Sequence, residues 1–197
     1  MQQTFLKCLA VMAFAGLLTS PLRADYLKNA NLQDDYSCWH GDGERVFLKA
    51  DGTEGTEADL GVTPVIKLSL SSHVSSVYQE IETRDEPTTM HVKVSVFASN
   101  DFKRNVPENA YSKAWDGDGA WYWGGGIPVA TVIPNVDFWI RGGGHGWYYK
   151  LAHLTPNAWV TVEGSYQGIE KATSQIVNFL VPPGTGAVYL KNPLVGP

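Results

Sequence analysis

The densest group of residues that could do chemistry lies between Tyr111 and Tyr149, a stretch with five of the seven Trp and nine of the twenty Gly. At its centre is the run Trp115-Asp-Gly-Asp-Gly-Ala-Trp121-Tyr-Trp123. Sugars are recognised by flat aromatic rings, which stack on the apolar faces of pyranoses, and by a few polar groups that bond the hydroxyls. We therefore predict a glycan-binding site formed by Trp115, Asp116, Asp118, Trp121, Tyr122 and Trp123, with Tyr111, Arg141 and His145 near it.

Carboxylate catalysis is the main alternative for the same stretch. Glycosidases hold two carboxyls on either side of the scissile bond, roughly 5 to 10 Å apart and usually on separate elements. Asp116, Glu163 and His145 are the candidates for acid or base roles. Glu80, Glu163 or Glu170 could supply the distant partner of Asp116 or Asp118, and the sequence does not select one. Under this alternative the chain is a small glycoside hydrolase or polysaccharide lyase, and the aromatic loop walls its cleft.

A second acidic group, formed by Asp51, Glu54, Glu57 and Asp59, lies in a loop with glycines and threonines. Carboxylates this close repel one another unless water or a cation separates them, so the loop is either a solvated turn or a Ca²⁺ site. No spacing of Cys and His residues is typical of metal ligands. We predict no cofactor, and structural Ca²⁺ enters only under the second of these two interpretations of the loop.

The segments that must position these groups alternate as β-strands do. Between Thr89 and Ser99, the residues Met90, Val92, Val94, Val96 and Ala98 share one face, which is typical of a half-buried antiparallel strand. Further strands are predicted at 26–32, 45–50, 65–70, 77–83, 136–141, 147–154, 158–166, 175–181 and 186–195. Between residues 100 and 135 the regularity stops, and connections of that length are more often functional than accidental.

These strands, the Pro- and Gly-rich turns between them and the lack of an amphipathic helix predict one all-β domain, an antiparallel β-sandwich. Trp39, Trp139, Trp147 and Trp159 lie in or beside strands, so we expect them in the core.

The first 24 residues have the pattern of a secretory signal peptide, with an apolar run from Cys8 to Leu18 and a cleavage site after Ala24. The domain then covers residues 25–197, and the protein is secreted, either to the periplasm or outside the cell. No later segment approaches the roughly 20 apolar residues of a membrane span. Cleavage removes Lys7 and Arg23, so the net charge moves from −5 to −7. Such a balance argues against nucleic acid or anionic lipid as a partner.

Cys38 is the only cysteine left after cleavage, so no internal disulfide can form. We expect it to be a small buried residue beside Trp39, and an intermolecular disulfide is the alternative. The sequence leaves the oligomeric state open.

Several motifs resemble those of jelly-roll carbohydrate-binding modules and the wider galactose-binding-like β-sandwiches. They are Tyr26-Leu-Lys-Asn29-Ala-Asn31-Leu32 before Trp39, the strand Val77-Tyr78-Gln79-Glu80-Ile81, the run from His91 to Ala98, Trp159-Val-Thr-Val162 with Tyr166, and Asn178-Phe-Leu-Val-Pro-Pro-Gly184 before Ala187-Val-Tyr-Leu190. The resemblance covers nearly all of residues 25–197. It implies a jelly roll that binds carbohydrate. In this family the last strand often offers an acidic ligand to a structural Ca²⁺, whereas this chain has Lys191 there.

The function we predict is therefore a secreted, non-catalytic protein that recognises a glycan or polysaccharide through its aromatic loop. The enzyme described above, built on the same jelly roll, is the first alternative. A surface or matrix protein whose aromatic loop docks on another protein is the second.

Overall fold

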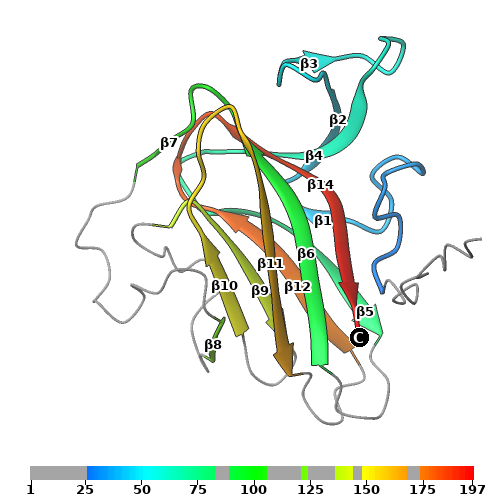
Figure 1. The fold of residues 1–197 in the computed structure, drawn as a ribbon, viewed down its shortest axis with the longest axis vertical. Coiled ribbons are helices and arrows are strands. Elements are labelled where there is room, and N and C mark those ends of the chain that lie inside the picture. Colours follow the sequence, from blue (N-terminus) through cyan, green and yellow to red (C-terminus); the bar gives the residue numbers. More distant parts are fainter. Residues whose placement is uncertain (1–25, 83–88, 106–120, 124–135, 144–147, 168–173) are drawn as a thin grey trace, which may run out of the picture.

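The computed structural model describes residues 26–82, 89–105, 121–123, 136–143, 148–167 and 174–197. In this part of the chain the strands form two six-stranded sheets that face one another, and all of their pairings are antiparallel (Figure 1). The prediction of an all-β antiparallel sandwich is confirmed. No helix in the described residues is long and apolar enough to span a membrane.

Sheet A has, in spatial order, β1 (His40–Gly41), β5 (Ser75–Glu82), β12 (Ser174–Val181), β9 (Phe138–Gly143), β10 (Tyr148–Ala152) and β8 (Trp121–Trp123). Sheet B has β11 (Trp159–Gln167), β6 (Thr89–Ala98), β14 (Ala187–Gly196), β4 (Thr63–Ser69), β2 (Glu44–Leu48) and β3 (Glu54–Gly55). A small third sheet pairs β13 (Gly184–Thr185) with β7 (Lys103–Arg104). Each strand predicted from residue 45 onward is present, and its ends differ from the predicted ones by at most two residues.

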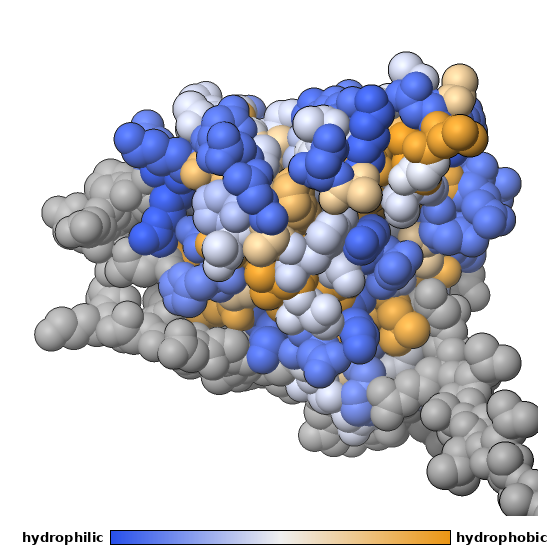
Figure 2. All heavy atoms as spheres, turned by 45° about the horizontal axis from the view of Figure 1, so that its top comes forward, coloured by the Kyte–Doolittle hydropathy of each residue, from blue (hydrophilic) through white to orange (hydrophobic). Residues whose placement is uncertain are grey.

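The core lies between the two sheets, as the alternation of β6 predicts. Met90, Val92, Val94 and Val96 are at most 2% exposed, and the residues between them are less buried until Phe97. Sheet A contributes Val77, Ile81, Phe138, Ile140, Val177 and Phe179 to the same cluster. Burying each such side chain stabilises the fold by roughly 1.5–3 kcal/mol. By contrast, the surface seen in Figure 2 is mainly hydrophilic and carries only small, separate hydrophobic patches.

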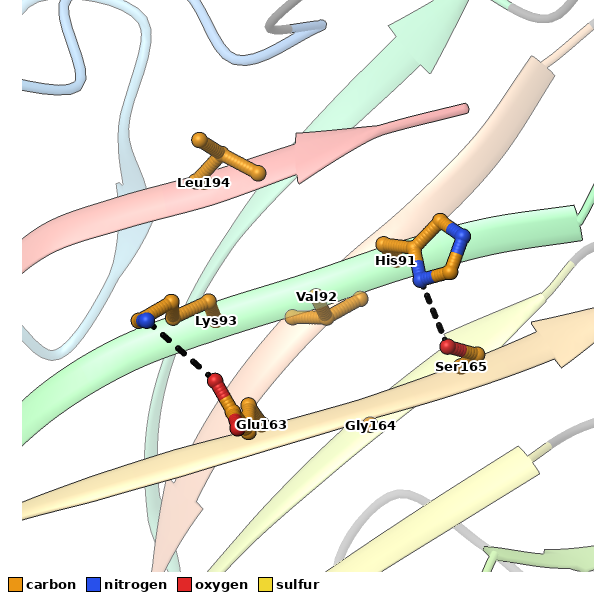
Figure 3. A pocket seen from close by; sticks show the side chains of 7 residues that line it. All are labelled: His91, Val92, Lys93, Glu163, Gly164, Ser165 and Leu194. Carbon is orange, nitrogen blue, oxygen red and sulfur yellow. Dashed lines mark hydrogen bonds and ion pairs between the residues drawn. The ribbon is translucent and has the colours of Figure 1, made fainter. Parts of the chain in front are cut away.

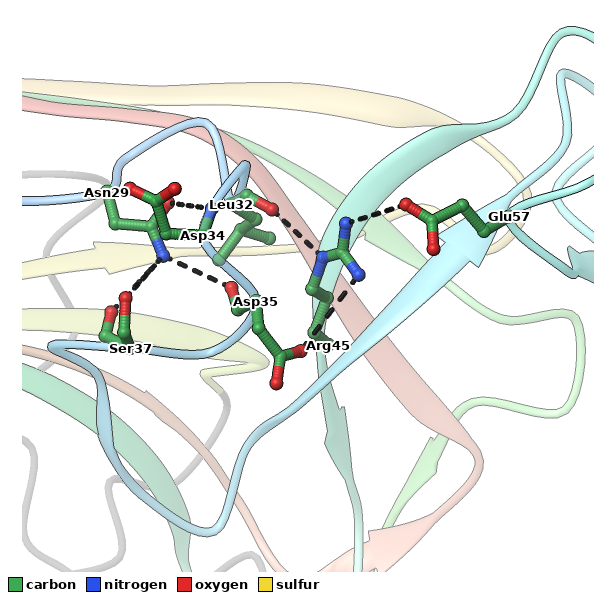
Figure 4. Close-up of polar contacts among 7 residues, drawn as sticks. All are labelled: Asn29, Leu32, Asp34, Asp35, Ser37, Arg45 and Glu57. Atoms are coloured by element: carbon green, nitrogen blue, oxygen red, sulfur yellow. Dashed lines mark hydrogen bonds and ion pairs between the residues drawn. The ribbon is translucent and has the colours of Figure 1, made fainter.

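The strand predicted at 26–32 is wrong, because this segment is a series of turns. Every third residue of the segment has the positive φ of a left-handed turn position: Asn29, Leu32, Asp35 and Cys38. The Asn29 side chain holds the turns together: its Nδ2 donates to the carbonyl oxygens of Asp35 (3.1 Å) and Ser37 (3.2 Å), as Figure 4 shows. Short side-chain amides tolerate this left-handed backbone and compete with strand pairing.

The turns are attached to the sandwich by buried contacts. Gln79 on β5 is 1% exposed; it accepts a hydrogen bond from the backbone N–H of Lys28 (3.0 Å) and donates one to the Lys28 carbonyl oxygen (2.7 Å). Leu27, Leu32 and Trp39 enter the core, which confirms the expectation for Trp39.

Cys38 is exposed, so the expectation that it is buried is wrong. It occupies the last of the left-handed turn positions, with φ of 69°, and the chain enters the core only at Trp39.

A second, smaller cluster lies on the outer face of sheet B around Phe97, which is 4% exposed. The ring centroid of Phe97 is 5.3 Å from that of Trp159 and 6.0 Å from that of Tyr189. Trp159 is 37% exposed, which corrects the prediction that it is a core residue. Its ring lies under the ammonium of Lys191, 3.6 Å from the ring centroid, a cation–π contact.

Candidate functional site

The outer face of sheet A carries a row of aromatic and polar residues that crosses four strands. Val177 and Phe179 of β12 point into the core, so Asn178 between them lies on the opposite face. The strand register aligns Asn178 with Tyr78 of β5 on one side and with Arg141 of β9 on the other.

His40 of β1 aligns with Tyr78 and completes the row His40, Tyr78, Asn178, Arg141, which we call the sheet A row.

The inner part of the sheet A row is buried although it does not belong to the core between the sheets. Asn178 and Arg141 are each 4% exposed, and Trp139 on the same face is 1% exposed. Trp139 is therefore buried, as predicted, but on the outer face of sheet A and not between the sheets. The Oδ1 atom of Asn178 is buried and has no hydrogen-bond partner in the described part of the chain. An unsatisfied buried acceptor costs roughly 1–3 kcal/mol, so its presence calls for an explanation.

The other end of the row opens into a pocket of about 350 Å³. The rings of His40 and Tyr78 lie 5.4 Å apart with planes tilted by 35°, and Tyr78 is half-buried. Glu80, Lys28 and Cys38 also line this pocket. An aromatic pair beside a carboxylate and an ammonium offers both an apolar surface and hydrogen-bonding groups.

The predicted aromatic residues lie at the far edge of the same sheet, as far as the structure describes them. Trp121, Tyr122 and Trp123 form β8, which pairs with β10 beside β9 (Figure 1). The backbone register continues the row, because Arg141 aligns with Tyr149 and Tyr149 with Tyr122. Trp115, Asp116 and Asp118 lie outside the described residues, as do Tyr111, His145 and Trp147.

A second pocket, of about 580 Å³, lies on the outer face of sheet B (Figure 3). Two cross-strand pairs between β6 and β11 form its floor. Lys93 Nζ lies 3.2 Å from a carboxylate oxygen of Glu163, and the Ser165 hydroxyl lies 2.6 Å from Nδ1 of His91. Leu194 of β14 supplies an apolar wall.

Of the predicted acid and base candidates the structure describes Glu163 and Glu80, and Glu80 lines the pocket at the end of the sheet A row. The Glu163 side chain is 64% exposed, and no other carboxylate belongs to the described residues that line its pocket. Asp116 and His145 lie outside the described residues, so whether either pairs with Glu163 stays a prediction.

The predicted calcium ligands are engaged by protein groups. Asp51 accepts hydrogen bonds from the hydroxyl (2.6 Å) and the backbone N–H (2.9 Å) of Thr53, and these bonds hold its pKa below the ordinary value. Asp59 accepts one from the backbone N–H of Thr56 (2.9 Å), which lowers its pKa, and lies 3.7 Å from Lys49 Nζ.

The other two predicted ligands, Glu54 and Glu57, form ion pairs with basic side chains of the protein. Glu54 lies 2.9 Å from Lys67 Nζ and accepts a hydrogen bond from the hydroxyl of Tyr189 (2.8 Å). Glu57 lies 3.5 Å from Arg45, which also donates to the carbonyl oxygen of Leu32 (Figure 4). In the described residues no three His, Cys, Asp or Glu side chains come close enough to share a metal ion. The geometry lends no support to a Ca²⁺ site in this loop.

Sequence reasoning placed Arg141 near the site but missed His40, Tyr78 and Asn178. These residues lie far apart in the chain, and only strand pairing aligns them. The one local signal is a large polar side chain inside an apolar strand, as at Asn178 in the run from Ile176 to Val181.

No protein-family model matches the chain, and no curated protein matches it by sequence. Several solved structures share its fold, including the following two. The xylan-binding CBM22-1 domain of Paenibacillus barcinonensis Xyn10C has a TM-score of 0.52 at 9% identity, covering 88% of this chain and 94% of that domain. The enzymatically active domain of tailspike protein 4 of bacteriophage CBA120 has a TM-score of 0.53 at 10% identity. That match covers 87% of this chain but 21% of the tailspike chain. The chain thus has the jelly-roll fold found in carbohydrate-binding modules.

Proposed function

We propose that the protein is a secreted, non-catalytic carbohydrate-binding protein that holds a glycan against the outer face of sheet A. The observation that carries the proposal is the open end of the sheet A row, where a pocket of about 350 Å³ places the His40–Tyr78 aromatic pair beside Glu80 and Lys28. A sugar reaches the row at this end, because Asn178 and Arg141 further along it are only 4% exposed. The fold supports the same conclusion.

Each part of the row has a role in this proposal. Tyr78, half-buried against His40, offers an apolar surface to a pyranose ring, and Glu80 accepts hydrogen bonds from its hydroxyls. Lys28, which is exposed and lines the same pocket, donates, since an ammonium carries three N–H groups and no acceptor. At the other end of the row, β8 adds Trp121, Tyr122 and Trp123. Trp115, Asp116 and Asp118 remain candidates on the sequence alone.

Binding is favoured over hydrolysis because Glu80 is the one carboxylate among the described residues that line the pocket of the row, whereas Glu163 lies on the opposite sheet and is paired with Lys93. The glycan proposed first is a xylan-type polysaccharide, because the CBM22-1 neighbour is a xylan-binding domain.

Titration calorimetry of residues 25–197 with xylohexaose, followed by other oligosaccharides on a glycan array, tests the proposal. Tyr78→Ala and the double variant Trp121→Ala/Trp123→Ala should each weaken binding at least tenfold and leave the thermal melt intact. Trp159→Ala truncates a part-exposed tryptophan of sheet B and serves as the matched control, with unchanged affinity. Equal affinity in all variants would refute the assigned surface.

Two further outcomes would overturn the function itself. New reducing ends or unsaturated products in a polysaccharide incubated with the protein would make it an enzyme. No response on the array would shift the assignment to a protein partner. Secretion is tested separately: the exported protein should begin at Asp25.

A further inference from the structure

The pocket on sheet B lies on the other side of the sandwich from the sheet A row. Its polar groups come from two strands in direct register, since His91 aligns with Ser165 and Lys93 with Glu163. All four side chains lie on the face opposite the buried Val92 and Val94. This surface therefore shares no residue with the site proposed above.

A bulge in β14 provides the apolar wall of the pocket. Lys191 aligns with Ser95 and Leu194 with Lys93, so three steps along β14 match two along β6. The extra residue leaves Leu194 on the same face as Lys93, while Val195 stays in the core. An apolar residue thus lies next to two polar pairs within one hollow of about 580 Å³.

The polar pairs keep bonding capacity beyond the contacts that they make with each other. An ammonium has three donors and a carboxylate about four acceptor sites, and the contact between Lys93 and Glu163 uses one of each. Their side chains are 57% and 64% exposed, so the remaining groups are accessible. In Figure 3 the second ring nitrogen of His91 points away from Ser165.

This combination selects a neutral ligand with several hydroxyls. Lys93 and Glu163 compensate each other's charge, so neither an anion nor a cation gains a net attraction from the pair. A hydroxyl both donates and accepts, so adjacent hydroxyls can bond the carboxylate and the ammonium together. Leu194 offers the apolar contact that a C–H face of a sugar ring requires.

We propose that this pocket is a second binding site, for a neutral pyranose, independent of the sheet A site. One chain then holds two glycan segments on opposite faces and can link polysaccharide chains to each other. The competing explanation is that the pairs only join the two strands, because an exposed ion pair can form without any ligand. Such a pair contributes only about 0–1 kcal/mol to stability.

The test is a nuclear magnetic resonance titration of residues 25–197 with the methyl β-pyranosides of xylose, glucose, galactose and mannose. For at least one sugar, the amides of Val92, Gly164 and Leu194 should shift with saturation. Glu163→Gln should weaken this response at least tenfold and leave any response at Asn178 unchanged.

Glu44→Gln is the matched control, because Glu44 also pairs with a lysine on sheet B, at 3.5 Å from Lys67, but does not line the pocket. It should leave the response at Gly164 unchanged. The proposal is overturned if no sugar shifts the three amides, or if Glu163→Gln binds as tightly as the parent protein. Failure of the function proposed for sheet A is distinguishable, since it removes the response at Asn178 alone.

Discussion

Replacing Gly52 with alanine tests whether the loop between β2 and β3 rests on Phe97. Gly52 has φ of +85°, and a Cβ there would overlap Cζ of Phe97 and lie 3.0 Å from Cε1. Gly61 is the matched control, with φ of +75° and nothing within 4 Å of its Cβ position. Both substitutions force alanine into left-handed backbone, but only the first adds a steric clash.

The two costs can be estimated separately. A left-handed alanine costs about 1–2 kcal/mol, partly offset by about 0.4–1 kcal/mol from the reduced entropy of the unfolded chain. Overpacking against a buried ring adds about 1–3 kcal/mol. Gly61→Ala should therefore lower the free energy of unfolding by about 1 kcal/mol, and Gly52→Ala by about 2–4 kcal/mol.

Urea denaturation of both variants, alone and in a Phe97→Leu background, measures these terms. Leucine lacks the ring atoms that a Cβ at position 52 would meet, so Gly52→Ala should cost about 1 kcal/mol in that background. The cost of Gly61→Ala should not change. Equal losses for the two glycine variants, or a Gly52→Ala cost that persists beside leucine, would show that the loop does not pack on Phe97.

Three further predictions concern stability and reactivity. Gln79→Leu removes two hydrogen bonds to the Lys28 backbone and should lower the free energy of unfolding by roughly 2 kcal/mol, or the melting temperature by about 4–8 °C; a loss within error in calorimetry would contradict this. Burial raises the pKa of Glu54, but hydrogen bonding, chiefly from Lys67, outweighs it and leaves that pKa below its ordinary value. Ionised Glu54 therefore stabilises the folded state above the pKa of an unfolded Glu, and this stabilisation is lost as the pH falls through the lower pKa of Glu54 in the folded protein. The melting temperatures of Glu54→Gln and of the parent protein should therefore converge in acid. Cys38 should react fully with a thiol reagent without denaturant; a protected thiol would contradict its exposed position.

The strands were predictable because their evidence is local. In β6 the alternation of β-branched and polar residues marks both the element and its buried face, and the structure confirms both. The turns at 26–39 were not predictable in this way. Their apolar spacing resembles a strand, and the left-handed positions are held by the Asn29 side chain and by Gln79, which is about 50 residues further along the chain.

The candidate sites could be predicted only in part, for a related reason. The aromatic loop stands out by composition, and its residues Trp121–Trp123 lie in sheet A. Asn178 becomes a candidate only once β12 pairs with both β5 and β9, and that register depends on contacts between distant segments. Trp159 shows the opposite error, since a strand position beside apolar residues suggested burial while the outer face leaves it partly exposed.

The bulge in β14 divides the last strand into two reading frames. Before the bulge the even-numbered residues, such as Leu190, face the core. From Leu194 onward the odd-numbered residues, such as Val195, face it instead. The extra residue acts on the folded chain as a frameshift acts on a coding sequence. If β14 paired with β6 without the bulge, Leu194 would face inward and Val195 would face water, as would every later residue of its parity. Losing one residue at Asn192 or Pro193 would close the bulge and leave both side chains on their present faces, so the position of Leu194 in the pocket depends on the length of this short segment.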